Sequence, residues 1–351
     1  MREALTAALA ALNDGRPAAL VTPVATTGSL PTGRLARMLV RDDGTTEGTV
    51  GGGRMEADVT AEARAASSGQ PRLVEFSLTN SAAMEDGLLC GGRATFLVEP
   101  VTAASAVGLR AVQAALATEA EALEAVRLDG DCRGARLVLG NSPGAAPAGS
   151  LGDAALDEAV AALLPEALDD DANEVRTVAA GATRAEVYLN ALVPRPVLYL
   201  FGGGHVGLAL ARLMPTAGFR LVVVDDREEF ANRERFPMAE RVLVRPFETA
   251  VADLDLGARS YVAIMTRGHR GDREVLAQAL RTRAAYVGMI GSRRKIATTW
   301  EILREQGFAE ADLARVHAPI GLPIGGDSPG EIAVSIAAQL IQTHRLGEQP
   351  D

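Results

Sequence analysis

Short apolar runs alternate with amphipathic segments beyond the prolines Pro194 and Pro196. The runs cover 197–201, 220–224, 241–244, 261–265 and 286–290. Several of the intervals between these runs have the composition of a helix, and so does the stretch that begins at Pro329. Short apolar runs linked through helices are typical of buried parallel strands with right-handed crossovers. Residues 194–351 are therefore predicted to form a Rossmann-like, doubly wound α/β domain.

The pattern ahead of the prolines is less regular. Strands are expected over 18–25, 36–41, 93–100 and 186–193, with a further strand that ends at Val50. Helices are expected over 1–12, 54–66, 103–117 and 153–164. The Gly-, Pro- and Ser-rich segment 141–152 is expected to be a mobile loop. Residues 1–193 are thus predicted to form an α+β domain.

Composition narrows the class of protein. With 351 residues the chain is long enough for two domains, and 48% hydrophobic and 23% charged residues are ordinary globular usage. A net charge of −10 argues against nucleic acid as a partner. No stretch is apolar enough to predict a membrane span. Only two cysteines, Cys90 and Cys132, are present, which favours reduced thiols and a cytoplasmic location.

A glycine-rich loop follows the first apolar run of the second half. Gly202-Gly203-Gly204-His205-Val206-Gly207 is a G-x-G-x-x-G that opens a helix, where bare amides and the helix dipole favour a phosphate. Asp225 ends the next apolar run, at the place where such folds put the acid that binds a ribose hydroxyl. This order predicts a Rossmann-like fold, but the fold alone does not fix the ligand.

A second run of glycines, Gly51-Gly52-Gly53, lies between a strand and a helix in the first half. A turn with positive φ accounts well for one glycine and poorly for three. A second cradle for a phosphate is the alternative, and both interpretations stay open. The hydroxyl-rich segment 26–29 could line the same cavity or be a plain loop.

Cys90 is flanked by Gly87, Gly91 and Gly92. A free cysteine is commonly a small buried hydrophobe, whereas the flanking glycines leave open a thiolate that handles sulfur or a soft metal. Cys132 lies in a polar turn and is assigned no role.

Further polar residues follow the strands expected over 261–265 and 286–290. His269 is expected to contact a ligand or carry a proton at the carboxyl edge of the sheet, and Asp272 is explained as a helix cap. Ser292, Arg293, Arg294 and Lys295 open the next helix, and Lys295 is the only lysine of the chain. Three cations in a first turn oppose the helix dipole, which favours an anion beside them over a merely solvated face.

The segment 319–331 carries several glycines and prolines before the last helix. Ser328 and Glu331 form a capping box with Pro329 at the first helical position, so helix initiation accounts for much of it. Its glycines could also border the ligand crevice.

Five ordered segments together give the chain a family resemblance. They are Val50–Gly53, Gly87–Gly92, Phe201–Gly207, Gly288–Lys295 and Pro319–Ile336. The chain resembles the XdhC/CoxI family, whose members mature molybdenum hydroxylases such as xanthine dehydrogenase and CO dehydrogenase. Two positions depart from the family pattern: Arg54 stands where a cysteine is common, and Arg267 where a histidine is frequent.

The resemblance implies a chaperone without turnover of its own on a small substrate. Such a protein binds molybdenum cofactor (molybdopterin) as cargo, shelters it while a cysteine desulfurase supplies sulfur, and assists its insertion into the large subunit of the apo-hydroxylase. The two glycine loops, Cys90, Asp225, His269 and the basic turn would contact the cofactor, and a homodimer is expected. An NAD(P)-dependent oxidoreductase, favoured by Gly202–Gly207 with Asp225, remains the alternative.

Overall fold

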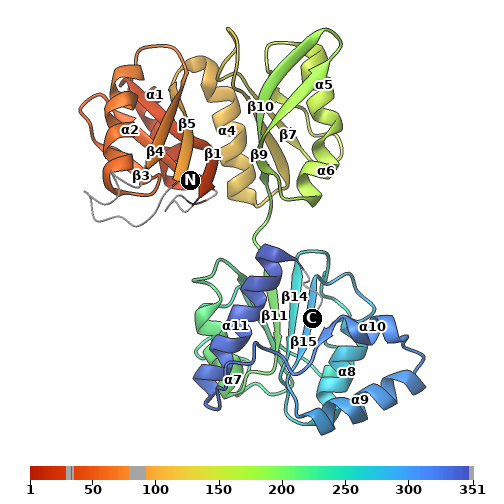
Figure 1. Ribbon diagram of the computed structural model, residues 1–351. Helices are drawn as coiled ribbons and strands as arrows, with labels where there is room; N and C mark the ends of the chain where they lie inside the picture. Colours follow the sequence, from red (N-terminus) through yellow and green to blue (C-terminus); the bar gives the residue numbers. More distant parts are fainter. Residues whose placement is uncertain (29–32, 34, 79–91, 348–351) are drawn as a thin grey trace. The chain divides into compact units, whose positions relative to one another are not determined.

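The computed structural model describes residues 1–28, 33, 35–78 and 92–347. The chain divides into two compact units, Met1–Pro194 and Arg195–Asp351 (Figure 1). The first unit contains two antiparallel sheets and the second a parallel sheet, which confirms the predicted mixture of an α+β half and a Rossmann-like half. Among the described residues, no helix combines the length and hydropathy that a membrane span requires.

The second unit is a doubly wound α/β domain. Its strands are β11 (Val197–Phe201), β12 (Arg220–Asp225), β13 (Arg241–Val244), β14 (Ser260–Ile264), β15 (Tyr286–Met289) and β16 (Val316–His317). They pair in parallel in the order β13-β12-β11-β14-β15-β16. The order reverses direction between β11 and β14, and ligands of open α/β sheets bind outside the carboxyl ends of the strands at such a reversal.

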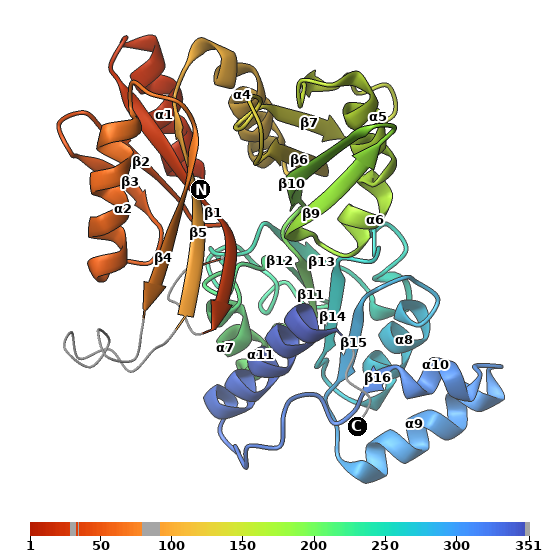
Figure 2. The ribbon, with the colours of Figure 1, turned by 45° about the horizontal axis from the view of Figure 1, so that its top comes forward.

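Helices cover both faces of this sheet, with α7 and α11 on one side and α8 and α9 on the other (Figure 2). They are α7 (His205–Leu213), α8 (His269–Ala279), α9 (Arg293–Glu305), α10 (Glu310–Ala314) and α11 (Pro329–Leu346), with a 3-10 turn over Phe247–Thr249. One apolar core lies under α8 and α9, and the other lies under α7 and α11. The predicted capping box at the start of α11 is confirmed, because Ser328 Oγ accepts from the Glu331 amide and Glu331 accepts from the Ser328 amide.

The first unit consists of two structural copies of one motif, a duplication that was not predicted from the sequence. The first copy is α1 (Arg2–Asn13), β1 (Ala18–Gly28), β2 (Arg37–Arg41), β3 (Thr46–Thr49), α2 (Gly53–Ala66), β4 (Arg72–Leu78) and β5 (Gly92–Pro100). The second is α4 (Ala103–Thr118), β6 (Ala122–Arg127), β7 (Arg136–Gly140), β8 (Ala148–Gly149), α5 (Ala154–Ala162), α6 (Leu164–Asp169), β9 (Asn173–Ala180) and β10 (Thr183–Leu192). The sheet orders, β3-β2-β1-β5-β4 and β8-β7-β6-β10-β9, are the same order repeated.

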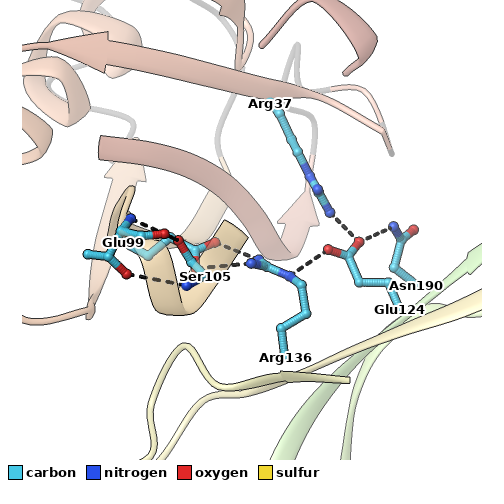
Figure 3. Close-up of polar contacts among 7 residues, drawn as sticks. Arg37, Glu99, Ser105, Glu124, Arg136 and Asn190 are labelled. Atoms are coloured by element: carbon cyan, nitrogen blue, oxygen red, sulfur yellow. Dashed lines mark hydrogen bonds and ion pairs between the residues drawn. The ribbon is translucent and has the colours of Figure 1, made fainter. Parts of the chain in front are cut away.

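A buried polar network joins the two copies (Figure 3). Arg37 and Arg136 are the first residues of β2 and β7, which are equivalent strands, and both donate to Glu124 on β6. Arg136 also forms a bidentate pair with Glu99 on β5, with N···O distances of 2.6 and 3.2 Å. Asn190 donates to Glu124 at 2.9 Å. A buried charge is tolerated only when it is paired, so this set of residues fixes how the copies pack.

The second sheet of this unit corrects the prediction for residues 101–185. No strand was expected there, yet β6, β7, β8 and β9 all lie within it, and β8 lies inside the segment predicted as a mobile loop. The strand β6 reads Ala-Leu-Glu-Ala-Val-Arg, a composition that favours a helix, and it is buried in the middle of a sheet. Tertiary packing therefore overrides local preference here.

Candidate functional site: a cation-lined cavity beside the glycine-rich edge

The glycine-rich loop has the geometry expected of a Rossmann turn. Gly202 has a φ of +113°, and a Cβ there would lie 2.2 Å from the Met265 carbonyl oxygen. A Cβ on Gly207 would lie 2.2 Å from the Gly202 carbonyl oxygen, so α7 packs closely on the turn. Gly204, the N-cap of α7, faces open space. Only this middle glycine leaves room for an approaching ligand, and His205 beside it is exposed.

Asp225 ends β12 as predicted, but its carboxylate already has partners. The side chain is fully buried and accepts from the Gly203 amide at 2.8 Å. The Arg227 amide and guanidinium also donate to it, at 3.1 and 3.0 Å. Burial alone would raise the pKa of Asp225, yet the bonds from Arg227 and Gly203 lower it below its usual value. The carboxylate therefore braces the glycine-rich loop, which weakens the predicted role as a ribose acceptor.

Asp272 likewise holds a loop through its carboxylate, on the β14 side of the point where the strand order reverses. The N-cap of α8 is Gly268, so the interpretation of Asp272 as a helix cap is wrong. Its carboxylate accepts from the amide and the hydroxyl of Thr266, both at 2.8 Å, and from the ammonium of Lys295. The buried carboxylate thus ties the end of β14 to the start of α9.

A cavity of about 450 Å³ lies where α8 and α9 begin. Its lining consists of His269, Arg273, Ser292, Arg294, Lys295, Thr298, Thr299 and Ile302. Three of these side chains are cations and three carry hydroxyls, and none of the lining residues that the structure describes is acidic. Asp272 is not part of this lining, but its buried carboxylate forms an ion pair with Lys295.

The start of α9 adds a directed field to the cavity. Ser292 is the N-cap, and its hydroxyl accepts from the Lys295 amide. The positive end of the helix dipole adds to the field of the two guanidinium groups, whereas Asp272 already compensates the charge of the Lys295 ammonium. Cations gathered at a helix N-terminus in a hollow site are suited to a phosphate or another compact anion.

The structure brings together four of the residues predicted for the site: His269, Ser292, Arg294 and Lys295. It places Arg293 on a different cavity, on the other side of the same helix start. Gly202, Gly204, Gly207 and Asp225 lie at the same sheet edge but do not line the cation-lined cavity.

Besides the apolar Ile302, three polar residues of this lining were not predicted from the sequence. Arg273 follows His269 by four positions, and Thr298 and Thr299 follow Lys295 by three and four. Residues with these spacings share one face of a helix. Extending the predicted residues along their helices would have found all three.

The Gly51–Gly53 turn holds a carboxylate of its own. Glu56 accepts from the Thr49 hydroxyl at 2.6 Å and from the amides of Val50 and Gly52 at 3.1 and 3.0 Å. Burial would raise the pKa of Glu56, whereas these three bonds lower it overall. All three glycines have positive φ, so a plain turn accounts for each of them, and no phosphate is needed to explain the run.

The second copy repeats this turn with different residues. Asp157 accepts from the Ser150 hydroxyl at 2.7 Å and from the Leu151 amide at 2.8 Å, and the Gly152 amide donates to Ser150 Oγ. Gly52 corresponds to Asp153, whose side chain caps α5. A turn present in both copies has a structural origin.

The remaining expectations concern the hydroxyl-rich segment 26–29 and the two cysteines. Thr26 lines a cavity of about 470 Å³ with Pro23 and Asn173, and Gly51–Gly53 do not line it. Cys90 lies outside the described residues, so its role stays a prediction. Cys132 is a half-buried free thiol packed against Gly152.

The chain thus combines two units. One is a doubly wound Rossmann domain with a cation-lined cavity at the carboxyl edge of its sheet, and the other contains two antiparallel sheets of the same strand order. Residues 11–77 match the model of the XdhC and CoxI family, and residues 198–340 match that of the XdhC Rossmann domain. The chain therefore belongs to the XdhC/CoxI family.

Two curated relatives match part of the chain. The uncharacterized protein YqeB of Escherichia coli K12 is 38% identical over 157 residues, which are 44% of this chain and 29% of that protein. A probable xanthine dehydrogenase subunit of Bacillus subtilis 168 is 26% identical over 159 residues, which are 45% of this chain and 46% of that protein. The matched segments thus span less than half of the length of either relative.

A solved structure shares the fold over nearly the whole chain. The crystal structure of a xanthine dehydrogenase from Bacillus halodurans superposes with a TM-score of 0.72 and 24% identity, covering 99% of this chain and 97% of that one. At this identity the likeness establishes the architecture alone.

Proposed function

We propose that this protein is an accessory factor for a xanthine dehydrogenase-type molybdenum hydroxylase and that it carries molybdenum cofactor as cargo. One observation carries the proposal: the cavity formed by His269, Arg273, Arg294 and Lys295 has no acidic side chain among its described lining residues and lies at the sheet edge where such folds bind ligands. Family membership supports the accessory role.

The chemistry of the cavity suits the phosphate of the cofactor. A terminal phosphate carries a charge of about −1.5 to −2 near neutral pH and offers several acceptor oxygens. Two guanidiniums, one ammonium and the N-terminal end of α9 supply matching donors. Lys295 is held by Asp272 and by the Ile290 carbonyl at 3.1 Å, so its ammonium is fixed in position while its charge is paired with Asp272.

Delivery and sulfuration form the finer part of the proposal. The protein would pass the cofactor to the large subunit of the apo-hydroxylase after a cysteine desulfurase has supplied sulfur. We assign Cys90 to this step because it is the thiol that lies in a sequence segment shared with the family. Replacing Cys90 with alanine should impair maturation of the hydroxylase and leave retention of the cofactor unchanged, because the phosphate contacts come from the other unit.

The test is retention and transfer of the cofactor. Purified protein is mixed at micromolar concentration with molybdenum cofactor, separated on a sizing column, and then added to apo-hydroxylase. We expect co-elution followed by the appearance of hydroxylase activity. No co-elution would reject the proposed cargo, and co-elution without activation would reject the delivery role.

An NAD(P)-dependent oxidoreductase is the second candidate, favoured by the geometry of Gly202, Gly204 and Gly207. Against it, Asp225 is already bound by Gly203 and Arg227. Calorimetric titration with NAD and with NADP separates the candidates, because saturable heat with either nucleotide would favour the oxidoreductase.

A further inference from the structure

Half of the large apolar side chains that stand exposed among the described residues lie on one short segment. Of eight such side chains, four belong to α11 or to the loop that leads into it: Ile324, Val334, Ile341 and Leu346. A fifth, Leu213, lies at the end of α7, which packs beside α11 (Figure 2). Single exposed apolar residues are ordinary, whereas a cluster of them marks an interaction surface.

Helix α11 has one face toward the sheet and one face toward solvent. The inner face packs in the core under α7 and α11. The outer face carries five residues spaced by three and four positions, which is the spacing with which one helix packs along another. We call these residues the α11 stripe: Glu331, Val334, Ala338, Ile341 and Arg345. Ala338 is half-buried, whereas Val334 is 50% and Ile341 40% exposed, so the apolar centre of the stripe is open to solvent.

The α11 stripe is complementary to a reversed copy of itself. Ala338 stands at its centre, with Glu331 seven residues before it and Arg345 seven residues after it. Val334 precedes Ala338 by four residues, and Ile341 follows it by three. A twofold axis through Ala338 therefore sets the acid of one helix against the arginine of the other. The same axis sets each Val334 close to Ile341 of the second helix.

The ends and the centre of the stripe contribute in different ways. Glu331 is exposed, and hydrogen bonds from Ser328 lower its pKa from 4.5 to about 2, so it is anionic at neutral pH. Exposed ion pairs add little stability but do select a direction, and two antiparallel helix dipoles favour the same direction. The methyl side chain of Ala338 lets two helix backbones approach closely. Stability would thus come from the apolar centre and orientation from the ends.

We propose that two copies of this chain associate through the α11 stripe as an antiparallel pair of helices, with the twofold axis at Ala338. Leu213 on α7 extends the apolar area. The pair is closed, because both copies use the same surface. The cation-lined cavity lies where α8 and α9 begin, on the other face of the sheet from α11, so it stays open in both copies. The inference does not depend on the proposed cargo.

Sedimentation velocity of the full-length protein tests the centre of the stripe. We expect wild type to sediment as a dimer in the micromolar range. Val334→Arg should sediment as a monomer, because it puts one like charge from each copy into the apolar centre. The matched control is Val107→Arg on α4, which replaces a valine that is 52% exposed and should leave the dimer intact.

Two results of this experiment would overturn the proposal. One is a wild type that stays monomeric up to submillimolar concentration. The other is a Val334→Arg protein that dimerises as tightly as wild type, because the dimer would then use another surface. Thermal unfolding of each variant checks that the fold is retained.

Arg345→Glu tests the antiparallel direction. It sets a carboxylate against Glu331 of the second copy at both ends and should weaken the dimer by about tenfold, since two exposed ion pairs are replaced by repulsion. Adding Glu331→Gln removes the repulsion and keeps a side chain that can complete the capping box, so most of the affinity should return. An Arg345→Glu protein that dimerises as tightly as wild type would contradict the antiparallel pair.

Ala338→Cys tests the position of the axis. Two cysteines close to a twofold axis can form a disulfide, because their Cα atoms lie within reach of each other. Mild oxidation in air should link two copies through this position, and peptide mass spectrometry distinguishes that link from any made by Cys90 or Cys132. Val107→Cys is the control and should not link. Equal linkage of the two variants, or none at Ala338→Cys, would overturn the assigned axis.

Discussion

The ammonium of Lys295 donates to the buried carboxylate of Asp272, so the only lysine of the chain is fixed at the edge of the cation-lined cavity. Asp272 is completely buried, and the Lys295 side chain is 13% exposed. A buried carboxylate that also holds Thr266 cannot move readily. The position of the cavity charge is therefore set by the end of β14.

Asp272→Asn should make Lys295 more reactive toward an amine-acylating reagent. The substitution keeps the shape of the side chain and removes the charge that holds the ammonium, so the amine becomes freer to attack the acylating reagent. An added peptide with one lysine is the reference, and peptide mass spectrometry after timed acylation gives the ratio of the two. We expect the ratio of Lys295 to reference modification to rise several-fold. An unchanged ratio would mean that Asp272 does not restrain Lys295.

Glu124 should make the first unit sensitive to acid. Burial would raise the pKa of Glu124, but Arg37 and Arg136 lower it from 4.5 to about 2. A depressed pKa adds stability above pH 4.5 that is lost as the pH falls toward 2. Glu124→Gln should therefore lower the free energy of unfolding by about 3–5 kcal/mol near neutral pH, because the buried Arg37 loses this carboxylate and Arg136 is left with Glu99.

Urea unfolding between pH 2 and pH 7 checks this expectation. The variant should lose less stability than wild type between pH 4.5 and pH 2. The exposed Glu158→Gln on α5 is the matched control and should follow the wild-type curve. If the stability of Glu124→Gln fell with pH in parallel with that of wild type, protonation of Glu124 would not be the cause of the acid sensitivity.

Glu56 should stabilise the Thr49–Gly53 turn. Glu56→Ala removes three hydrogen bonds, to Thr49, Val50 and Gly52, and should cost about 1–3 kcal/mol of unfolding free energy. Asp157→Ala in the second copy should have a cost of the same order, because Asp157 occupies the equivalent turn. Cofactor retention should not change in either variant, and a selective loss of retention in Glu56→Ala would restore the first turn as a ligand site.

Much of the second unit could be predicted from its sequence because its four central strands, β12, β11, β14 and β15, are buried on both faces. Continuous apolar runs such as Val197–Phe201 locate parallel strands directly, and β11 and β13 have the predicted bounds. The partners of Asp225 and Asp272 could not be predicted. Asp225 holds the loop that follows the neighbouring strand β11, and Asp272 holds the start of α9, which follows β15. No local pattern encodes these contacts between loops.

The duplication in the first unit left little trace in the sequence. The copies share an order of elements, but Glu56 corresponds to Asp157 and Gly52 to Asp153, and the equivalent strands differ in composition. β6 in particular carries the buried Glu124, a residue that breaks the apolar pattern of a central strand. Glu124 is paired only in the folded unit, so its charge kept the sequence pattern from indicating a strand of the second sheet there.

The affinity of wild type, Arg294→Ala and Arg212→Ala for molybdenum cofactor tests the central claim most directly. Arg294 lines the cation-lined cavity, whereas Arg212 is exposed on the last turn of α7 and serves as a control with the same change in net charge. We expect Arg294→Ala to weaken binding by about tenfold or more, since a charge-assisted contact is worth about 1.5–3 kcal/mol, and Arg212→Ala to match wild type. Equal affinity in all three proteins would contradict the assignment of the cavity to the cofactor phosphate.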